Sequence, residues 1–246
     1  MIIHKAKIFE KFPEIIFGFS QKIKLNENDR FSFNMSKSIL DDENIIEKNR
    51  KKFFNELGLD LKNVVIEKQT HSSIINIVHT FQNNLVGDAL ITKTKNLGLA
   101  VSTADCTNIY LFDSKEKVIA AVHSGWEGTE KRILEKNVRK LVDEFSCNPK
   151  NIHVYFGPSI SQKNYEVGKE FDQKFDTKYI ISKGEKYLLD LKSANKDILL
   201  SFGVPETQIE IDEICSFGDN NFHSFRRDKQ NSGRAFGVIA MKGLNE

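Results

Sequence analysis

Residues 118–128 have the sequence VIAAVHSGWEG, and this stretch gives the first indication of the fold. It opens with a continuous apolar run, rich in β-branched side chains, that is typical of a buried strand. Gly125 and Gly128 follow in what reads as a turn. Residues 129–145 then repeat apolar side chains at helical spacing, which predicts an amphipathic helix with Thr129 as its N-cap. A buried strand followed by such a helix predicts a sheet covered by helices.

Short β-rich runs dominate the rest of the chain. Strands are predicted over 2–9, 14–19, 31–35, 64–68, 74–78, 89–92, 97–102, 109–112, 118–122, 152–156, 187–191, 208–214 and 235–241. Further helices are predicted over 41–57 and 193–202. In the first of these helices, Arg50 shares the helical spacing of Ile46 and Phe53. The chain has neither a GxGxxG nor a GxxxxGK[ST] motif, which argues against a simple doubly wound fold. Many strands and few helices predict an α+β fold with mixed sheets, and the lack of a linker predicts one domain over 1–246.

The composition excludes several classes of protein. The 246 residues include 36 Lys and Arg against 34 Asp and Glu, a net charge of +2, so no nucleic-acid partner is expected. With 39% hydrophobic residues the chain can bury a core, which excludes global disorder. No apolar run approaches the roughly 18 residues of a membrane span, so we expect no membrane partner and no secretory segment. Three widely spaced Cys residues form no disulfide framework, and we expect a reducing, cytoplasmic location.

Three potential metal ligands follow strand-like runs, namely His71, Cys106 and His123. Zinc binds Cys thiolates and His nitrogens, and three protein ligands leave one position open for water or substrate. The three residues converge only if their strands lie side by side, and taken singly each is more typical of a buried strand end. Cys106 and His123 also support a metal-free interpretation, in which the imidazole activates the thiol as a nucleophile.

Two further segments carry residues suited to an anion or a purine ring. Gly125 and Gly128 let the backbone approach a ligand closely, and free N–H groups at a helix start favour anions. Trp126 stands in the same turn and can stack on a base, although an ordinary turn with a packed Trp explains these residues equally well. Arg226 and Arg227 lie among aromatic residues and suit a phosphate or a nucleotide ring. The alternative is a solvated edge strand in which a neighbouring aspartate pairs with one arginine.

Eight short motifs together give the chain a specific resemblance. They are QTH at 69–71, GDALIT at 87–92, ADC at 104–106, HSGWEG at 123–128, GPSI at 157–160, YEVG at 165–168, LDL at 189–191, and SFRRD at 224–228 with the later Gly233-Arg234. In this order they resemble the YfiH-like family, also called the laccase-domain or polyphenol-oxidase family. Its members are regarded as purine nucleoside phosphorylases. The resemblance runs over nearly the whole chain.

The resemblance implies a fold, a metal and a set of activities. The implied fold is a layered α/β/β/α sandwich with mixed sheets, and the family's zinc ligands carry over onto His71, Cys106 and His123. The implied reactions are phosphorolysis of adenosine, inosine, guanosine and methylthioadenosine, together with deamination of adenosine. Copper-dependent oxidation of phenols and editing of peptidoglycan precursors have also been attributed to the family. This chain departs from the pattern at Glu127, where an Arg is usual, and in segment 23–30, which lacks the usual glycines.

Residues and resemblance together predict a zinc-dependent purine nucleoside enzyme that acts on a nucleoside and phosphate. Cys106 is the metal-binding thiolate, and Asp105 orients a ligand or the substrate. Arg226, Arg227 or the helix start after Gly128 holds the phosphate, and the charge of Glu127 is expected to weaken phosphate binding. Copper is the other metal that suits two His and one Cys. Two alternatives stay open: a metal-free cysteine hydrolase, and a degenerate zinc- or purine-binding protein without turnover. The sequence predicts no oligomeric state.

Overall fold

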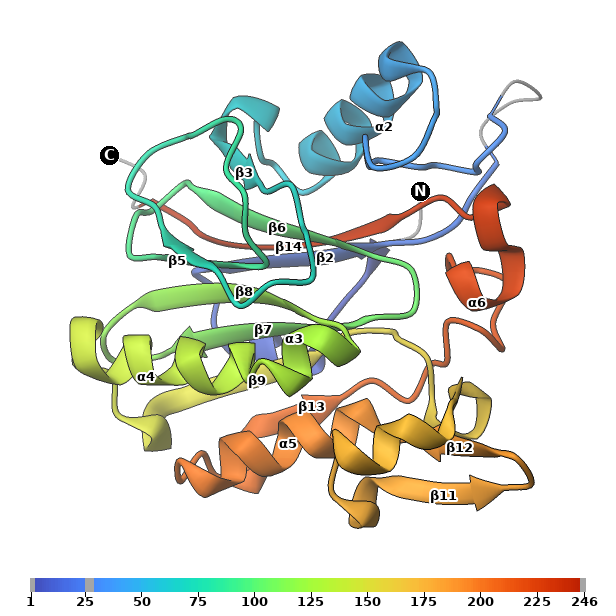
Figure 1. Cartoon of the computed structure of the whole chain (residues 1–246). Helices are drawn as coiled ribbons and strands as arrows, with labels where there is room; N and C mark the ends of the chain where they lie inside the picture. The colour runs from blue at the N-terminus through green and yellow to red at the C-terminus, as the bar shows by residue number, and fades with distance from the viewer. Residues whose placement is uncertain (1–2, 25–28, 244–246) are drawn as a thin grey trace.

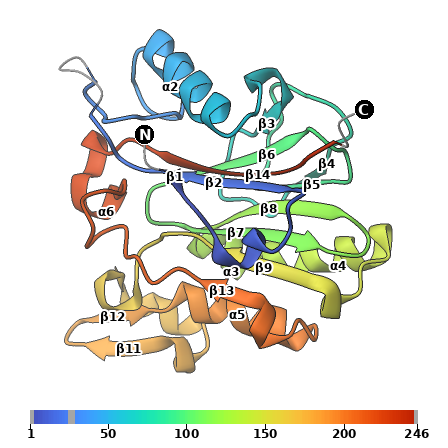
Figure 2. The same ribbon diagram turned by 180° about the vertical axis from the view of Figure 1, so that it is seen from behind.

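A computed structural model describes residues 3–24 and 29–243 of the chain. Two sheets lie face to face, and helices cover the outer face of each (Figure 1). Helix α2 (Glu43–Glu56) lies over one sheet, while α4 (Ile133–Phe145) and α5 (Leu191–Ser201) lie over the other. The view from behind shows the same layers (Figure 2). The expected α+β class and its α/β/β/α layering are therefore confirmed, while the extent of one domain over the whole chain stays a prediction.

The sheet beneath α2 has five strands in the order β1-β2-β14-β6-β3. Its strands are β1 (Ile3–His4), β2 (Ile15–Ser20), β14 (Ala235–Met241), β6 (Gly98–Thr103) and β3 (Val64–Ile66). All neighbours run antiparallel except β3 and β6, which are parallel. Strand β14 lies between β2 and β6, and Gly237 pairs with both Phe19 and Val101. A glycine is required there because a Cβ would lie 1.8 Å from the hydroxyl oxygen of Tyr110.

The facing sheet has six strands in the order β13-β9-β7-β8-β5-β4. Its strands are β13 (Ile209–Ile211), β9 (Ile152–Phe156), β7 (Thr107–Asp113), β8 (Val118–Ser124), β5 (Ala89–Thr92) and β4 (Ile75–Ile77). The outer pairs, β13 with β9 and β4 with β5, are parallel, and the inner pairs are antiparallel. In β8, Ile119 packs between the sheets, whereas Ala120 and Val122 pack on the helix side. Burial on both faces explains why this run is continuously apolar.

Smaller elements complete the described part of the chain. A three-stranded antiparallel sheet has the order β10-β12-β11, with β10 (Glu166–Val167), β12 (Lys186–Leu189) and β11 (Ile180–Lys183). The remaining α-helices are α1 (Lys7–Glu10), α3 (Trp126–Glu130) and α6 (Phe225–Asp228). The 3₁₀ segments are η1 (Leu61–Asn63), η2 (Pro149–Asn151), η3 (Gln162–Asn164), η4 (Lys169–Gln173), η5 (Thr177–Tyr179), η6 (Glu206–Gln208) and η7 (Lys229–Asn231). Among the described helices, none has the length and hydropathy that crossing a membrane requires.

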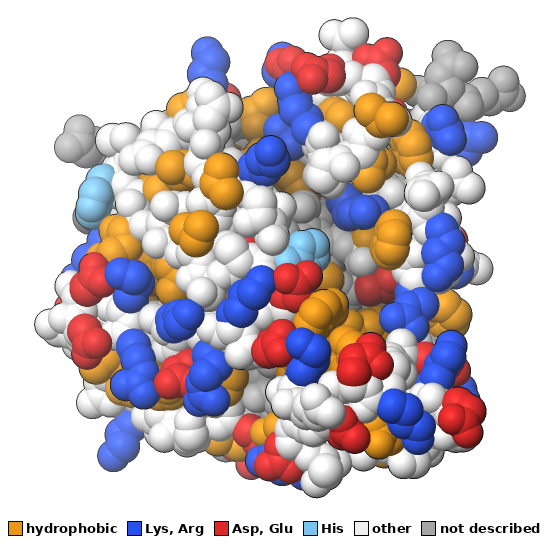
Figure 3. All heavy atoms as spheres, in the orientation of Figure 1, with side chains coloured by type: hydrophobic (Ala, Val, Ile, Leu, Met, Phe, Trp, Pro, Cys, Tyr) orange, Lys and Arg blue, Asp and Glu red, His pale blue; other side chains and the backbone are white. Residues whose placement is uncertain are grey.

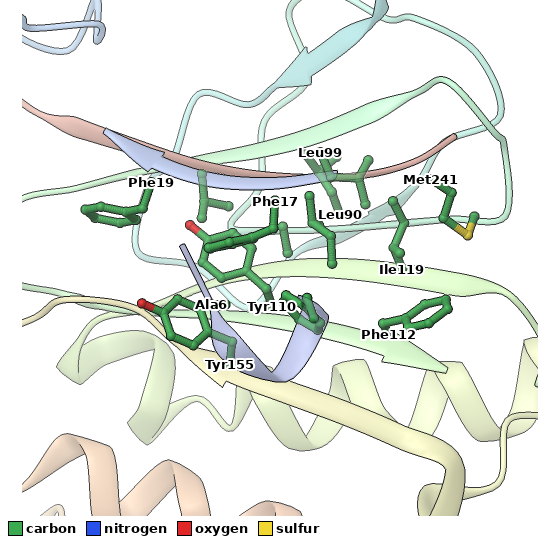
Figure 4. Close-up of a cluster of buried hydrophobic side chains, with 14 of the residues drawn as sticks. Ala6, Phe17, Phe19, Leu90, Leu99, Tyr110, Phe112, Ile119, Tyr155 and Met241 are labelled. Carbon is green, nitrogen blue, oxygen red and sulfur yellow. The ribbon is translucent and has the colours of Figure 1, made fainter. Parts of the chain in front are cut away.

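Aromatic and aliphatic side chains from both sheets fill the space between them (Figure 4). The ring of Phe17 in β2 lies edge-on to Tyr110 and Tyr155, with ring centroids 4.9 and 5.0 Å away. Such aromatic pairs add about 0.5–1.5 kcal/mol to the stabilisation that comes from burying their area. Because this core fixes one sheet against the other, the loops at the ends of the sandwich hold defined positions.

The helix predicted over 129–145 is two helices, α3 and α4. The chain breaks at Arg132, which has a left-handed φ of 59° and precedes α4. Gly125, rather than Thr129, is the N-cap residue of α3. The Thr129 hydroxyl instead donates a hydrogen bond to the Gly125 carbonyl inside that helix. The apolar spacing predicted the helical character correctly, but it carried no signal for the break.

Two predicted strands are wrong for local reasons. Residues 31–35 turn rather than extend, since Phe33 has a φ of 70° and donates its N–H to the Asp29 carboxylate. Their alternating apolar pattern therefore reflects burial in a turn. The strand predicted over 2–9 is the short β1 followed by α1. Part of 2–9, and part of the glycine-poor segment 23–30, lies outside the described residues.

Candidate metal centre

Three side chains far apart in the sequence meet at one end of the sandwich. His71 follows β3, Cys106 lies between β6 and β7, and His123 belongs to β8. Their ligand atoms all lie within 4.8 Å of one another, with 4.0 Å between Cys106 Sγ and His71 Nε2. The two imidazole rings are inclined at 72°, with centroids 5.0 Å apart. The structure thus brings the three predicted metal ligands into one group.

The chain passes from one sheet to the other at this centre. Residues 104–106 connect β6 to β7, and Asp105 within this link has a φ of 94°. Thr103 Oγ1 donates a hydrogen bond of 2.7 Å to the Cys106 carbonyl and holds the link in place. Gly125 packs directly on the thiol, because a Cβ there would lie 2.9 Å from Cys106 Sγ. The close approach that the sequence suggested for Gly125 is therefore an approach to Cys106.

Asp88 is a fully buried carboxylate that organises two of the three ligands. Its Oδ1 accepts hydrogen bonds from the His71 backbone N–H at 3.1 Å and from His123 Nδ1 at 2.9 Å. Its Oδ2 accepts from the backbone N–H groups of Thr70 and Ser72 and from the Ser72 hydroxyl. A proton on Nδ1 leaves the Nε2 of His123 free to bind a metal. Carboxylates stand behind metal-binding histidines in this way, where they fix the ring and raise its basicity.

The loop that carries His71 is tied on two further sides. Gln69 donates to the Ser102 carbonyl through Nε2, and its Oε1 accepts from the Ser102 N–H and hydroxyl. Lys131 Nζ donates to the His71 carbonyl at 2.7 Å and to Glu127 at 2.8 Å. These contacts hold His71 at a left-handed φ of 56°. These hydrogen bonds tie the ligand loop to β6 and to Lys131.

The charges of the buried side chains depend on one another. Burial acts to raise the pKa of Cys106, but the charge of His123 and hydrogen bonds from both histidines outweigh it and lower this pKa to about 6. Burial acts to lower the pKa of His123, but the Cys106 thiolate and Asp88 raise it to about 9. Burial opposes ionisation of Asp88 too, and hydrogen bonds from His123 and Ser72 hold its pKa well below the ordinary value. At neutral pH the centre presents a thiolate, the form of Cys that binds metals and acts as a nucleophile.

The donor set and its spacing fit one metal ion. Tetrahedral zinc, with bonds of about 2.3 Å to sulfur and about 2.0–2.1 Å to nitrogen, places its ligand atoms about 3.3–3.6 Å apart. The three ligand atoms here lie within 4.8 Å of one another, somewhat farther apart than in such a site. Across residues 3–24 and 29–243, no second group of three or more His, Cys, Asp or Glu side chains is spaced to share an ion. The geometry therefore defines a candidate site for a single metal ion.

A cleft of about 1110 Å³ opens beside the metal centre. Its wall includes His71, Cys106, His123, Arg50, Phe225 and Arg234. The face of the molecule in Figure 3 is hollowed near its middle, and basic and acidic side chains intermix around the hollow. Because ligand pockets are about 300–1,000 Å³, this cleft has room for a nucleoside together with a second small group.

Arg227, Trp126 and Gly128 lie outside the residues that line this cleft. The guanidinium of Arg227 donates to the carbonyl oxygens of four residues and to the carboxylate of Asp228. The ring of Trp126 packs on Phe171, with centroids 5.1 Å apart. The phosphate contact predicted for Arg227 and the base stacking predicted for Trp126 therefore have no support in this geometry. Their contacts instead hold the chain around the site.

Asp105 and Arg226 are joined beside the centre. Asp105 Oδ2 accepts from the Arg226 backbone N–H at 2.6 Å, and its Oδ1 accepts from the Ser216 hydroxyl at 2.7 Å. The Arg226 guanidinium donates to the Glu166 carbonyl and lies over the ring of Tyr165, 5.2 Å from its centroid. Asp105 therefore holds the start of α6, and any influence on a ligand passes through these contacts.

Glu127 is not among the residues that line the cleft. Its side chain is 37% exposed and forms an ion pair of 2.8 Å with Lys131, one turn along the chain. The expectation that its charge repels phosphate is therefore not supported. Its influence on the site runs through Lys131, which in turn holds the His71 carbonyl.

Sequence reasoning missed Asp88, Arg50 and Arg234. Asp88 is part of the motif at 87–92, but nothing in the spacing relates it to His123, 35 residues away. The signal for Arg50 was its place on the apolar side of a helix, where a charged residue is out of character. Arg234 is the last residue of the motif that begins with SFRRD at 224–228. Within that motif the phosphate contact was assigned to Arg226 or Arg227 instead.

Known proteins share both the sequence and the fold of this chain. Residues 17–242 match the family described as multi-copper polyphenol oxidoreductase laccase. A Clostridium acetobutylicum protein named purine nucleoside phosphorylase is 36% identical over 200 residues, which is 79% of this chain and 82% of that protein. A protein named adenosine deaminase, from an unknown prokaryotic organism, is 33% identical over 206 residues, or 76% and 78% of the two chains. The crystal structure of YlmD from Geobacillus stearothermophilus is 27% identical and superposes with a TM-score of 0.90, over 97% of this chain and 94% of that one.

Proposed function

This chain belongs to the multi-copper polyphenol oxidoreductase laccase family, and on that premise we propose that it is a zinc-dependent purine nucleoside phosphorylase that also deaminates adenosine. The observation that carries the proposal is the group of His71, Cys106 and His123 in the wall of a large cleft. Relatives at 36% and 33% identity bear the names of the two activities. The proposed nucleosides are adenosine, inosine, guanosine and methylthioadenosine, phosphate is the second substrate, and the cytoplasm is the proposed location.

The chain's own residues prepare the centre for a metal. Zinc held there would supply a Lewis acid at the wall of the cleft. Cys106 is already a thiolate at neutral pH, because the neighbouring histidines lower its pKa to about 6. Asp88 accepts the Nδ1 proton of His123, so Nε2 is the ring nitrogen that would bind the metal once it gives up its own proton. Hydrogen bonds from Gln69 and Lys131 keep the loop of His71 in place.

The proposed reactions differ in the nucleophile. In phosphorolysis a phosphate oxygen bonds to the anomeric carbon of the ribose while the bond from that carbon to the purine nitrogen breaks. The electron pair of the broken bond passes to the purine, which takes up a proton and leaves as the neutral base. In deamination water adds to C6 of adenine, and ammonia leaves. In both reactions the cleft would orient the reactants. Gly125 packs on Cys106 and Arg226 is joined to Asp105, so both would support the metal end of the cleft without lining it.

The observation that favours a second function is the charge state of Cys106. A thiolate beside a protonated His123 is the arrangement of a metal-free cysteine hydrolase. Against an oxidase with several coppers stands the single three-ligand group found among the described residues. A protein that binds zinc or a purine without turnover would keep the same centre.

One screen separates these functions. Zinc-loaded protein is incubated with each nucleoside, with and without phosphate, and the products are separated by chromatography. The proposal expects free base only when phosphate is present, and inosine from adenosine without phosphate. Chelation should abolish both reactions, and added zinc should restore them. Activity that survives chelation would indicate the cysteine hydrolase, and a bound nucleoside without product would indicate the protein without turnover.

A further inference from the structure

Two arginines line the α2 side of the cleft without a carboxylate partner. Arg50 projects from α2, and Arg234 immediately precedes β14. Both are partly buried, and neither forms an ion pair with another described residue. Burying a cation costs free energy unless an anion or a set of hydrogen bonds compensates it. Two such arginines in the wall of one cleft therefore point to an anionic ligand.

The contacts of Arg50 leave one edge of its guanidinium free. Its Nε donates to the Met35 carbonyl at 2.6 Å, and its guanidinium carbon lies 5.3 Å from the ring centroid of Phe236. Its two terminal nitrogens donate to no described residue. Burial lowers the pKa of Arg50 to about 10, so the side chain is still a cation at neutral pH.

The carboxylates closest to Arg50 along α2 are engaged elsewhere. Glu43 pairs with Lys37 at 2.9 Å, and Glu47 pairs with Lys51 at 2.8 Å. Both acidic residues near Arg50 on α2 are therefore paired with a lysine. Glu47 also lines the cleft, and the charges of both glutamates act on Arg50, but neither forms an ion pair with it.

Arg234 connects this side of the cleft to the metal centre. Its Nη1 donates to the carbonyl oxygens of Ser232 and Gly233, and its guanidinium carbon lies 5.4 Å from the ring centroid of Phe225. Its Nε and Nη2 donate to no described residue. Arg234 and the metal ligand Cys106 both line the cleft. Burial lowers the pKa of Arg234, and the charges of Cys106 and Asp105 act in the opposite direction.

One short segment fixes the two arginines relative to each other. Asn34 Oδ1 accepts from the backbone N–H of Arg234, and the next residue, Met35, accepts from Arg50 Nε. Arg234 and Phe236 are two residues apart in an extended stretch, so their side chains share a face of the sheet. Since Arg50 stacks on Phe236, both guanidinium groups border the same part of the cleft.

We propose that Arg50 and Arg234 form a binding site for a phosphoryl dianion on the α2 side of the cleft. The parallel N–H donors of a guanidinium match the oxygens of phosphate. Two guanidinium groups carry a positive charge equal in size to the negative charge of the dianion. The site itself follows from the geometry, whereas the choice of phosphate rests on the proposed function. The dianion is either inorganic phosphate or a phosphoryl group carried by the nucleoside.

Equilibrium dialysis with radiolabelled inorganic phosphate measures this binding without turnover. Zinc-loaded wild type is compared with Arg50→Met, Arg234→Met and the control Arg139→Met. Methionine keeps an apolar stem of similar length, so the packing on the aromatic rings is retained. Arg139 is a matched control because its guanidinium carbon also lies 5.3 Å from an aromatic ring, that of Phe202, but outside the cleft. Circular dichroism and thermal unfolding verify that each variant folds.

Each cleft variant should raise the phosphate Kd at least about tenfold, while Arg139→Met should change it less than about twofold. If Arg50→Met fails to fold, Arg50→Lys keeps the charge, loses the paired donors, and should still weaken binding severalfold. Unchanged binding in both cleft variants overturns the proposal. Loss of binding upon chelation, with both arginine variants binding normally, overturns it too by placing phosphate on the metal. Loss in Arg226→Met alone would likewise place phosphate elsewhere.

Competition identifies the source of the dianion. If neither adenosine nor adenosine 5′-monophosphate displaces phosphate, the site serves inorganic phosphate beside the nucleoside. If the monophosphate displaces phosphate and adenosine does not, the site takes the phosphoryl group of a nucleotide. Both outcomes support the site. Arginine-dependent binding in a protein that releases no base would retain the site and refute the proposed function. If the protein releases base but both arginine variants bind phosphate as the wild type does, the proposed function is kept and the arginine site is refuted.

Discussion

Replacing Asp88 by Asn tests the arrangement behind the metal centre most directly. Asp88 accepts two hydrogen bonds at Oδ1 and three at Oδ2. Asn keeps one carbonyl oxygen, loses the negative charge and places an NH₂ group against N–H donors at the other position. In one orientation His71 and His123 lose their acceptor, and in the other Thr70 and Ser72 lose theirs. No orientation of the amide restores the native set.

The size of the effect follows from these contacts. Loss of a carboxylate behind a metal-binding histidine costs about 10–100-fold in metal affinity. Each buried donor left unpaired costs about 1–3 kcal/mol of stability, and at least two donors are left in either orientation. Asp88→Asn should therefore raise the zinc Kd by about 10–100-fold and lower the free energy of unfolding of the metal-free protein by at least about 2 kcal/mol.

Competition with a chromophoric zinc chelator gives the Kd, and urea unfolding gives the stability. Asp212→Asn is the matched control. Asp212 also accepts hydrogen bonds from a histidine, His4, from the Tyr155 hydroxyl and from the Ile214 backbone N–H, but none of these residues belongs to the metal centre. This control should lose stability and keep its zinc affinity. An Asp88→Asn protein that binds zinc as tightly as the wild type would refute the reasoning.

Three other substitutions probe separate features. Cys106→Ala should remove zinc and activity together, whereas Cys147→Ala, at a buried thiol outside the centre, should lower stability and leave the zinc content in elemental analysis unchanged. Glu127→Arg should leave the phosphate concentration for half-maximal phosphorolysis within about twofold, because the exposed pair with Lys131 lies outside the cleft; kinetics at varied phosphate check this. Burial lowers the pKa of His223 to about 3. Because this side chain titrates near 6.5 in the unfolded chain, the unfolded state gains its proton first and stability falls as the pH drops from about 6.5 toward 3. His223→Asn should flatten that part of the stability curve in urea titrations at stepped pH, and a curve of unchanged slope would count against the buried neutral imidazole.

The sequence predicted those parts of the fold that depend on local pattern. The run 118–122 is apolar throughout because β8 is buried on both faces, and a pattern of this kind is visible without any knowledge of the partner strands. The ligand types of the metal centre were visible for a similar reason, since few residue types bind zinc. The three ligands meet only because their strands lie close together in the fold, and the spacing of residues in the sequence does not reveal the strand order.

The remaining features depend on contacts between distant segments or on hydrogen bonds from side chains to backbone carbonyl oxygens. Arg227 was predicted to bind phosphate, but its guanidinium donates hydrogen bonds to carbonyl oxygens of the 216–222 segment. Because every residue has a backbone carbonyl, residue types in the sequence do not predict such contacts. Asp88 accepts a hydrogen bond from His123 across two neighbouring strands, and the sequence offered Asp88 only as part of the motif at 87–92. The helix break at Arg132 rests on a single left-handed residue within an otherwise regular apolar repeat.

Strand β14 has a consequence for the order in which this protein is assembled. It follows every other described strand in the chain, yet it fills the middle of the five-stranded sheet, between β2 and β6. Until residues 235–241 have left the ribosome, those two strands expose unpaired edges to solvent or to a chaperone. Arg234 and Phe236 belong to the same segment, so the nascent chain gains these two residues of the cleft wall when the sheet closes. A growing chain therefore lacks this part of the cleft until the five-stranded sheet is complete.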